Sequence, residues 1–433
     1  MRMWGLVGVG VLALCLLSAL RAQAVPAFAR REGVTCQMCH FRPPELNQDG
    51  HDYVRRGLRE KPGGMGAMPS MGKTPAPRST PEMPGMAMPP AAGKPAGETP
   101  AIQSGSEMPG MAVRPAAGKP AALGTPLALP EGEYWALLAH PGVVVQRGAE
   151  PEFQKGTIDL WLIGPRDSHW SAVANPNYDL DAEEFGWDQA YAQYITHWTS
   201  RFQSARVGRV VPLAILLNQG GPSMTLSAPV VLSTPADTGN PWTPSTLLRA
   251  TEVGAVNLPQ GSVYLGAGRP VLEDSEGVRA HTDIYASAER LLGSAGDSLS
   301  AYGYWGKAQL SPGTRERGFH RVALFGNVYR RQQKWVAGYL SGRDTAAEGT
   351  RLDNSGWFLL GEQLVSDRLA AYARYDGYRQ DLVGGGGRRI RGPALGASWW
   401  VRTEAWLTVE AQALRTSDQG TERVVSAQVT LAF

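Results

Sequence analysis

The stretch that decides the fold is VVSAQVTLAF, residues 424–433. Its apolar side chains occupy every second position, namely Val425, Ala427, Val429, Leu431 and Phe433. The residues between them are mostly small or polar. A period of two is typical of a β-strand with one apolar face. The end of the chain therefore predicts a strand that separates an apolar environment from a polar one.

The same alternation extends upstream through the last 300 or so residues. Leu407 and Val409 alternate with Thr408 and Glu410. Further alternating runs are Val322, Leu324 and Val328 against Arg321, Phe325 and Asn327, and Tyr302, Tyr304, Ala308 and Leu310 against Ala301, Gly303, Trp305, Lys307 and Gln309. Polar residues 366–368 predict a short turn, and residues 341–354 and 376–391 predict long loops.

These patterns predict an all-β fold over residues 131–433, an outer-membrane antiparallel β-barrel of roughly 14–16 strands. A soluble β-sandwich is the alternative. The barrel is favoured by the number of strands, by a leader sequence, and by the terminal Phe433, which resembles the assembly signal of bacterial outer-membrane proteins. Tryptophans near strand ends are candidates for the interfacial girdles of a barrel: Trp335, Trp357, Trp399, Trp400 and Trp406.

Residues 1–24 have the features of a signal peptide. Arg2 precedes an apolar core over residues 4–20, and Ala22-Gln23-Ala24 is a cleavage site of the small-x-small type. Cys15 lies within this leader, so the mature chain keeps two cysteines. The sequence predicts export, and the net charge of +3 with no basic cluster gives no indication of a nucleic-acid partner.

Those two cysteines form the sequence Cys36-Gln37-Met38-Cys39-His40, the C-x-x-C-H pattern of c-type haem attachment. Two thiols one turn apart can add to the porphyrin vinyl groups, and the adjacent imidazole can ligate the iron. A disulfide would not need His40, and zinc would need further ligands. Residues 25–60 are therefore predicted to be a small domain with one covalent haem c. The preferred sixth ligand is His51, ahead of Met65, Met68 and Met71.

Residues 61–130 are rich in Met, Pro and Gly, and they predict a disordered linker. EMPGMAMPPAAGKPA at 82–96 is repeated as EMPGMAVRPAAGKPA at 107–121. Thioether ligands suit Cu(I), so Met83, Met86, Met108 and Met111 are a candidate copper site. A low-complexity linker without any metal is the preferred interpretation. An acidic run is likewise interpreted as a solvated loop rather than a cation site at a pore mouth: Asp179, Asp181, Glu183, Glu184 and Asp188.

The N-terminal sequence resembles bacterial fused cytochrome–porin proteins. The likeness lies in VPAFARR at 25–31, in GVT at 33–35, in the haem motif, and in Phe41 and PELN at 44–47. The sequence RVGRVVP at 206–212 and residues 254–268 are similar to recurring barrel-strand sequences of that group. Members include outer-membrane iron oxidases, in which a haem domain enters the barrel lumen. The resemblance implies Cys36 and Cys39 as thioether residues and His40 as an axial ligand.

The predicted function is an outer-membrane electron conduit, with the haem domain in the lumen or on the periplasmic side. It would oxidise extracellular Fe(II), or a similar reduced donor, and pass electrons to a periplasmic cytochrome c or cupredoxin. Outer-membrane lipid would surround the barrel. Whether the chain is an Fe(II):cytochrome c oxidoreductase stays open. The alternatives are a porin that captures copper through the Met-rich segment, outward electron transfer, and a plain porin.

Overall fold

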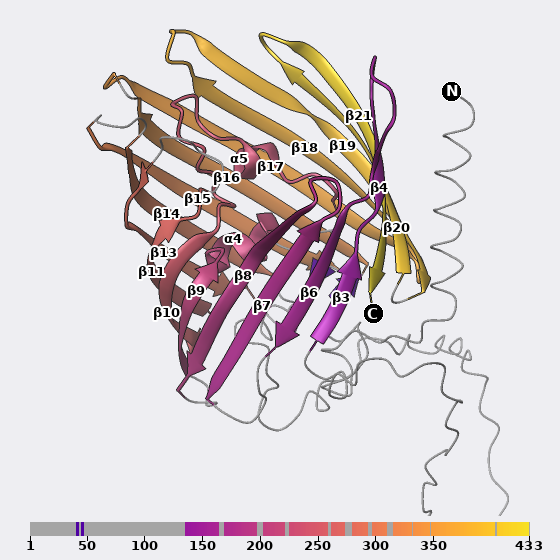
Figure 1. Ribbon diagram of the computed structural model, residues 1–433, viewed down its shortest axis with the longest axis horizontal. Helices are drawn as coiled ribbons and strands as arrows, with labels where there is room; N and C mark the ends of the chain where they lie inside the picture. Colours follow the sequence, from indigo (N-terminus) through magenta and orange to yellow (C-terminus); the bar gives the residue numbers. More distant parts are fainter. Residues whose placement is uncertain are drawn as a thin grey trace, which may run out of the picture. The chain divides into compact units, whose positions relative to one another are not determined.

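Most of the chain beyond residue 134 forms a closed antiparallel β-barrel, drawn in Figure 1 with its strands coloured from magenta to yellow. The computed structural model describes residues 40–42, 45–46, 135–163, 169–196, 202–220, 225–258, 261–272, 279–292, 297–309, 315–330, 332–346, 348–402 and 405–432. The barrel closes because the last strand, β21 (Gly420–Ala432), pairs with the first ones, β3 (Trp135–Ala139) and β4 (Gly142–Gln146). The sequence prediction of an outer-membrane type barrel is confirmed as a fold.

The barrel has 16 strands, the upper end of the predicted range. Three of them are interrupted, and their halves carry separate labels: β3 with β4, β5 (Glu152–Gln154) with β6 (Thr157–Ile163), and β12 (Arg279–Ala280) with β13 (Asp283–Leu291). The first interruption falls at Pro141, which has no N–H to donate to the ladder. The uninterrupted strands besides β21 are β7 (Trp170–Asp179), β8 (Glu184–Ile195), β9 (Phe202–Val210), β10 (Leu248–Leu258), β11 (Gly261–Pro270), β14 (Ser298–Gln309), β15 (Arg317–Arg330), β16 (Gln333–Thr345), β17 (Arg351–Ser366), β18 (Leu369–Asp381), β19 (Gly387–Arg402) and β20 (Ala405–Thr416).

The two faces of the wall differ in polarity, as the alternation predicts. Val322, Leu324 and Val409 point outward and are 40–51% exposed, whereas Arg321 and Glu410 on the opposite face are buried inside the barrel. The outer wall is therefore apolar, and the interior carries the charges, which is the arrangement of a barrel surrounded by lipid. The alternating run around residue 302 is oriented the other way. Tyr302 and Tyr304, which the alternation groups with the apolar side chains, are buried in the lumen, whereas Leu299 and Trp305 face outward.

Successive strands connect at two ends of the barrel. At the short-turn end the connections include residues 331–332, 367–368 and 403–404, which confirms the turn predicted at 366–368. At the loop end they include 346–350, 382–386 and 417–419. The long loops predicted at 341–354 and 376–391 are wrong, because most of these polar residues extend the strands β16 to β19.

The predicted aromatic girdle is partly correct. Trp335, Trp357 and Trp399 face outward and are 45–48% exposed. Trp357 stacks on Tyr375 of the neighbouring strand, with ring centroids 5.8 Å apart. Trp400 and Trp406 are wrong as girdle residues, because they are buried on the lumen face at 4% and 6% exposure. Adjacent positions 399 and 400 point to opposite faces, as the pleat requires.

One connection at the loop end is long and folds inward. Residues 211–247 join β9 to β10, and we call them the inward segment. They contain the short helices α4 (Leu213–Ile215) and α5 (Val230–Ser233) and the π-helical turn η3 (Leu216–Gly220). α4 contacts β13 and β14, whereas α5 contacts β17 and β18 on the far wall (Figure 1). No helix in the described ranges is long and apolar enough to cross a membrane.

Outside the barrel, the structure describes one short hairpin. β1 (His40–Arg42) pairs with β2 (Glu45–Leu46), with His40 opposite Leu46. His40 thus begins a strand directly after the second cysteine of the attachment motif. The predicted domain boundaries at 24, 60 and 130 lie outside the described residues and stay predictions.

Candidate functional site

The inward segment is anchored to the near wall of the barrel by a buried ion pair. Arg206 of β9 donates from Nη2 to Glu252 Oε1 at 2.7 Å, and its Nε donates to the same oxygen at 3.0 Å. The other carboxylate oxygen accepts the backbone N–H of Leu213 at 3.2 Å, and Arg206 also donates to the carbonyl of Val211. Both side chains are 3% exposed or less. One buried pair therefore fixes the point where the segment leaves the wall.

A second anchor holds the tip of the segment to the far wall. Arg374 of β18 donates to the carbonyl and the hydroxyl of Ser227, and its Nε pairs with Asp376 at 2.8 Å. Glu410 of β20 accepts the N–H groups of Leu226 and Ser227 at 3.1 and 3.2 Å. Arg374 and Asp376 are fully buried, so the anchor is shielded from bulk water.

The returning part of the segment packs on an aromatic wall. Trp242 lies 4.4 Å from Tyr304 and 5.1 Å from Phe319, measured between ring centroids. The guanidinium of Arg321 lies 5.3 Å from the Trp242 ring, and Arg321 is itself paired with Asp344 at 2.8 Å. Such a desolvated stack holds the segment without leaving an unpaired charge.

These three contacts make the inward segment a crossbar of the lumen. It starts between β9 and β10, touches β18 and β20, and returns past β14 and β15. The arginines that hold it each have an acidic partner: Arg206 with Glu252, Arg321 with Asp344, and Arg374 with Asp376. The crossbar narrows the passage, and its anchoring charges are neutralised internally.

The site residues predicted from the sequence lie almost entirely outside the described residues. This holds for Cys36, Cys39 and His51, and for the candidate copper ligands Met83, Met86, Met108 and Met111. Of the set, the structure describes only the backbone of His40, in β1. The haem site and the copper site therefore stay predictions. In the described ranges no group of three or more His, Cys, Asp or Glu side chains could hold a metal ion.

Most of the acidic run lies at the turn between β7 and β8, where two of its members stabilise backbone, but Asp188 lies within β8 and is half-buried, so it is not part of a solvated loop. Asp181 accepts the N–H groups of Lys155 and Gly156 at 2.9 and 3.0 Å. Asp179 accepts those of Asp181 and Ala182. These acids have structural partners in an exposed turn, in line with the interpretation as a solvated loop.

The crossbar was missed by sequence reasoning, although a signal was present. Residues 211–247 lack a sustained alternation and contain Pro212, Pro222, Pro229, Pro235, Pro241 and Pro244. Proline excludes a central strand, so the run marks the longest interruption in the strand pattern. Its partners Arg374 and Glu410 lie more than 140 positions away in the sequence, and no local pattern connects them.

A closed antiparallel barrel with an apolar outer wall, a charged interior and an inward-folded connection is the architecture of porins. No protein-family model matches the chain, and no curated protein matches it. Among solved structures, the outer membrane channel DcaP of Acinetobacter baumannii is similar with a TM-score of 0.53 and 11% identity, over 69% of this chain and 96% of that one.

Two further neighbours have the same fold. The anion-selective porin from Comamonas acidovorans gives a TM-score of 0.52 and 13% identity, over 69% of this chain and 98% of that one. The outer-membrane expressed OmpT of Vibrio cholerae gives 0.52 and 11%, over 69% and 97%. At such identities the likeness shows the fold alone. The described barrel thus has the porin fold, and the likeness covers no more than 69% of the chain.

Proposed function

We propose that the chain is an outer-membrane electron conduit, in which a porin-type barrel and a monohaem c-type cytochrome domain share one polypeptide. One observation carries the proposal: the attachment motif Cys36 to His40 stands on the same exported chain as the barrel. The apolar outer wall and the porin fold support a location in the bacterial outer membrane. Electrons would pass from extracellular Fe(II), or another reduced donor, to a periplasmic cytochrome c or cupredoxin.

The donor set of the motif suits a covalently bound haem. The thiols of Cys36 and Cys39 would hold it by thioether bonds, and the imidazole of His40 would be an axial ligand. When bound, the haem supplies one-electron redox chemistry. His51 is the first candidate for the opposite axial position, with Met65, Met68 and Met71 as alternatives.

The barrel supplies the passage through the membrane. Strands β14 to β21 have 12–16 residues each, more than the roughly 9–11 that a tilted strand needs to cross the hydrocarbon core. The interior is polar, so a small protein domain could be accommodated there at little desolvation cost. The crossbar limits free diffusion, which suits a protein that transfers an electron without moving the metal ion.

The deciding experiment is an optical spectrum of the purified, oxidised full chain before and after anaerobic Fe(II). We expect c-type haem bands that sharpen within seconds of adding Fe(II), and no haem in Cys36→Ala/Cys39→Ala. Proteoliposomes with oxidised cytochrome c trapped inside should then show its reduction by external Fe(II). A haem that dithionite reduces but Fe(II) does not, at any pH tried, would overturn iron oxidation and favour electron export or copper handling.

A second candidate is a solute porin, favoured by the porin fold and by the polar side chains that line the barrel interior. A channel of this kind would conduct ions in planar bilayers even when the haem motif is removed. If Cys36→Ala/Cys39→Ala keeps the full conductance and the intact protein takes no electrons from any donor, the solute porin is the better description. Cu(I) binding that is lost on changing Met83, Met86, Met108 and Met111 to Ser would add copper capture to it.

A further inference from the structure

Outward-facing arginines gather at the loop end of the barrel in directly opposed pairs. Arg379 of β18 is the register partner of Arg389 of β19. Arg391 of β19 is the register partner of Arg415 of β20. On the other side of the barrel, Arg249 of β10 faces Arg269 of β11. All six side chains are exposed.

Such pairs are unfavourable unless an anion lies between them. Like charges directly opposite each other on neighbouring strands destabilise a sheet. None of the six side chains has an ion pair or a side-chain hydrogen bond within the described part of the chain. The short-turn end differs, because outward-facing Arg330 is paired there with Asp297 at 2.7 Å. The loop end thus presents cationic pairs that lack a protein counter-ion.

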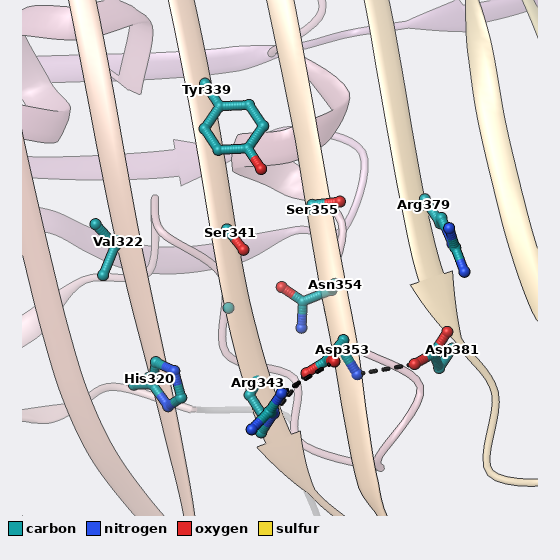
Figure 2. Close-up of a pocket in the computed structure, with 11 residues that line it drawn as sticks. His320, Val322, Tyr339, Ser341, Arg343, Asp353, Asn354, Ser355, Arg379 and Asp381 are labelled. Carbon is teal, nitrogen blue, oxygen red and sulfur yellow. Dashed lines mark hydrogen bonds and ion pairs between the residues drawn. The ribbon is translucent and has the colours of Figure 1, made fainter.

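A hollow of about 480 Å³ lies in the outer wall beside one of these pairs, between strands β15 and β18. Figure 2 shows Arg379 on one flank and His320 with Arg343 on the other. The wall is hollowed here because small side chains form the bottom of the hollow, with Ser341 directly opposite Ser355. Two carboxylates also line the hollow: Asp353 pairs with Arg343, and Asp381 accepts the backbone N–H of Asp353 at 3.1 Å. Arg379 is the arginine of the hollow that makes no ion pair within the described part of the chain.

The hollow also borders the apolar part of the wall. Val322 and Tyr339 line the side of the hollow away from Arg343 and Asp353, and they are 49% and 50% exposed (Figure 2). A ligand seated there would touch arginine and hydroxyl groups at one edge and apolar side chains at the other. That combination fits a lipid headgroup better than a free anion, because only a lipid fills both parts.

From this geometry we propose that the outer wall at the loop end binds phosphorylated lipid headgroups. Their phosphates would lie between the paired arginines, foremost Arg379 with Arg389 and Arg391 with Arg415, and one headgroup would occupy the hollow. A sugar headgroup that carries more than one phosphate could contact more than one of these arginine pairs. The proposal concerns the barrel alone and does not depend on the haem, so it can fail or succeed independently of the electron-conduit proposal.

The test measures binding of a diphosphorylated glycolipid, lipid A in detergent micelles, to the full chain. We expect Arg379→Gln/Arg389→Gln to weaken binding roughly twenty-fivefold, because each arginine near a membrane surface contributes about fivefold. Arg379→Lys/Arg389→Lys keeps the charge and should retain most of the affinity. The control Arg330→Gln/Arg368→Gln removes the same charge at the short-turn end and should leave binding unchanged.

Thermal unfolding with and without lipid gives a second measurement, which does not depend on fitting a binding curve. Without lipid, Arg379→Gln/Arg389→Gln should be as stable as the parent chain or more stable, since the change removes a repulsion. With lipid A, the parent chain should gain stability and the variant should gain much less. Equal weakening by the control variant would overturn the proposal. Equal protection by inorganic phosphate at the same concentration would also overturn it, because the site would then bind any anion.

Discussion

Asp181 is an exposed carboxylate that provides hydrogen-bond acceptors where a barrel strand is interrupted between β5 and β6. Its oxygens accept the N–H groups of Lys155 and Gly156, the two residues between β5 and β6. Gly156 has a φ of +80°, and a Cβ there would lie 1.9 Å from the carbonyl oxygen of His140. The backbone at this break is therefore fixed by sterics as well as by the carboxylate.

The same two N–H groups, Gly156 first, hold the pKa of Asp181 below its usual value. A depressed pKa in the folded state stabilises the protein above the unfolded pKa of about 3.9, and the contribution is lost as the pH falls through the folded value. We expect Asp181→Asn to unfold at a lower temperature at pH 7, with a difference that shrinks below about pH 4. Thermal scans at both pH values test this, with the exposed Glu150→Gln as control. A difference that is the same at both values would contradict the assignment.

At the scale of elements, the far anchor of the crossbar predicts a large difference between two ion pairs. Arg374→Met leaves the carboxylate of Asp376 buried without its partner, so we expect a loss of about 3–5 kcal/mol in the free energy of unfolding. Arg343→Met removes the exposed pair with Asp353 and should cost less than about 1 kcal/mol. Denaturant unfolding in detergent measures both.

The double variant Arg374→Met/Asp376→Leu distinguishes two causes of the lost stability: the loss of the ion pair and the burial of an unpaired carboxylate. It should be more stable than Arg374→Met alone, because no unpaired carboxylate remains in the interior. Its crossbar should also be less firmly held, which single-channel recordings would show as a larger or noisier conductance. If the double variant were less stable than Arg374→Met, the unpaired carboxylate of Asp376 would not be the cause of the lower free energy of unfolding.

The elements that the sequence predicts well are those with local patterns. Alternation in β15 and β20 identified the outward-facing residues correctly, because a period of two follows from the backbone alone. Tyr302 and Tyr304 face the lumen although they are large and partly apolar. Trp242 of the crossbar covers Tyr304 from inside, and Tyr302 packs against Tyr285 and Tyr304. The anchors of the crossbar could not be predicted, because Arg374 and Ser227 meet only once the barrel has closed.

At the scale of the whole molecule, the described wall is self-contained. Each of its strands pairs with a neighbour between residues 135 and 432, and β21 closes on β3 and β4. The anchors of the crossbar likewise come from the barrel itself. The haem motif at residues 36–40 is thus separate in sequence from every contact that closes the barrel.

This separation predicts that the barrel folds without its haem. In the full chain, Cys36→Ala/Cys39→Ala should lose the covalent haem and keep the barrel, because the strand pairings that close the wall among the described residues all lie between residues 135 and 432. Heat-modifiable migration in gels and the thermal midpoint should stay within about 2 °C of the parent chain, which corresponds to less than about 1 kcal/mol for a domain of this size. His40→Ala serves as a milder control that leaves both thiols in place. If the double variant failed to form a heat-modifiable barrel while His40→Ala formed one, attachment of the haem would be a step in assembling the barrel, and the two parts would fold as one unit.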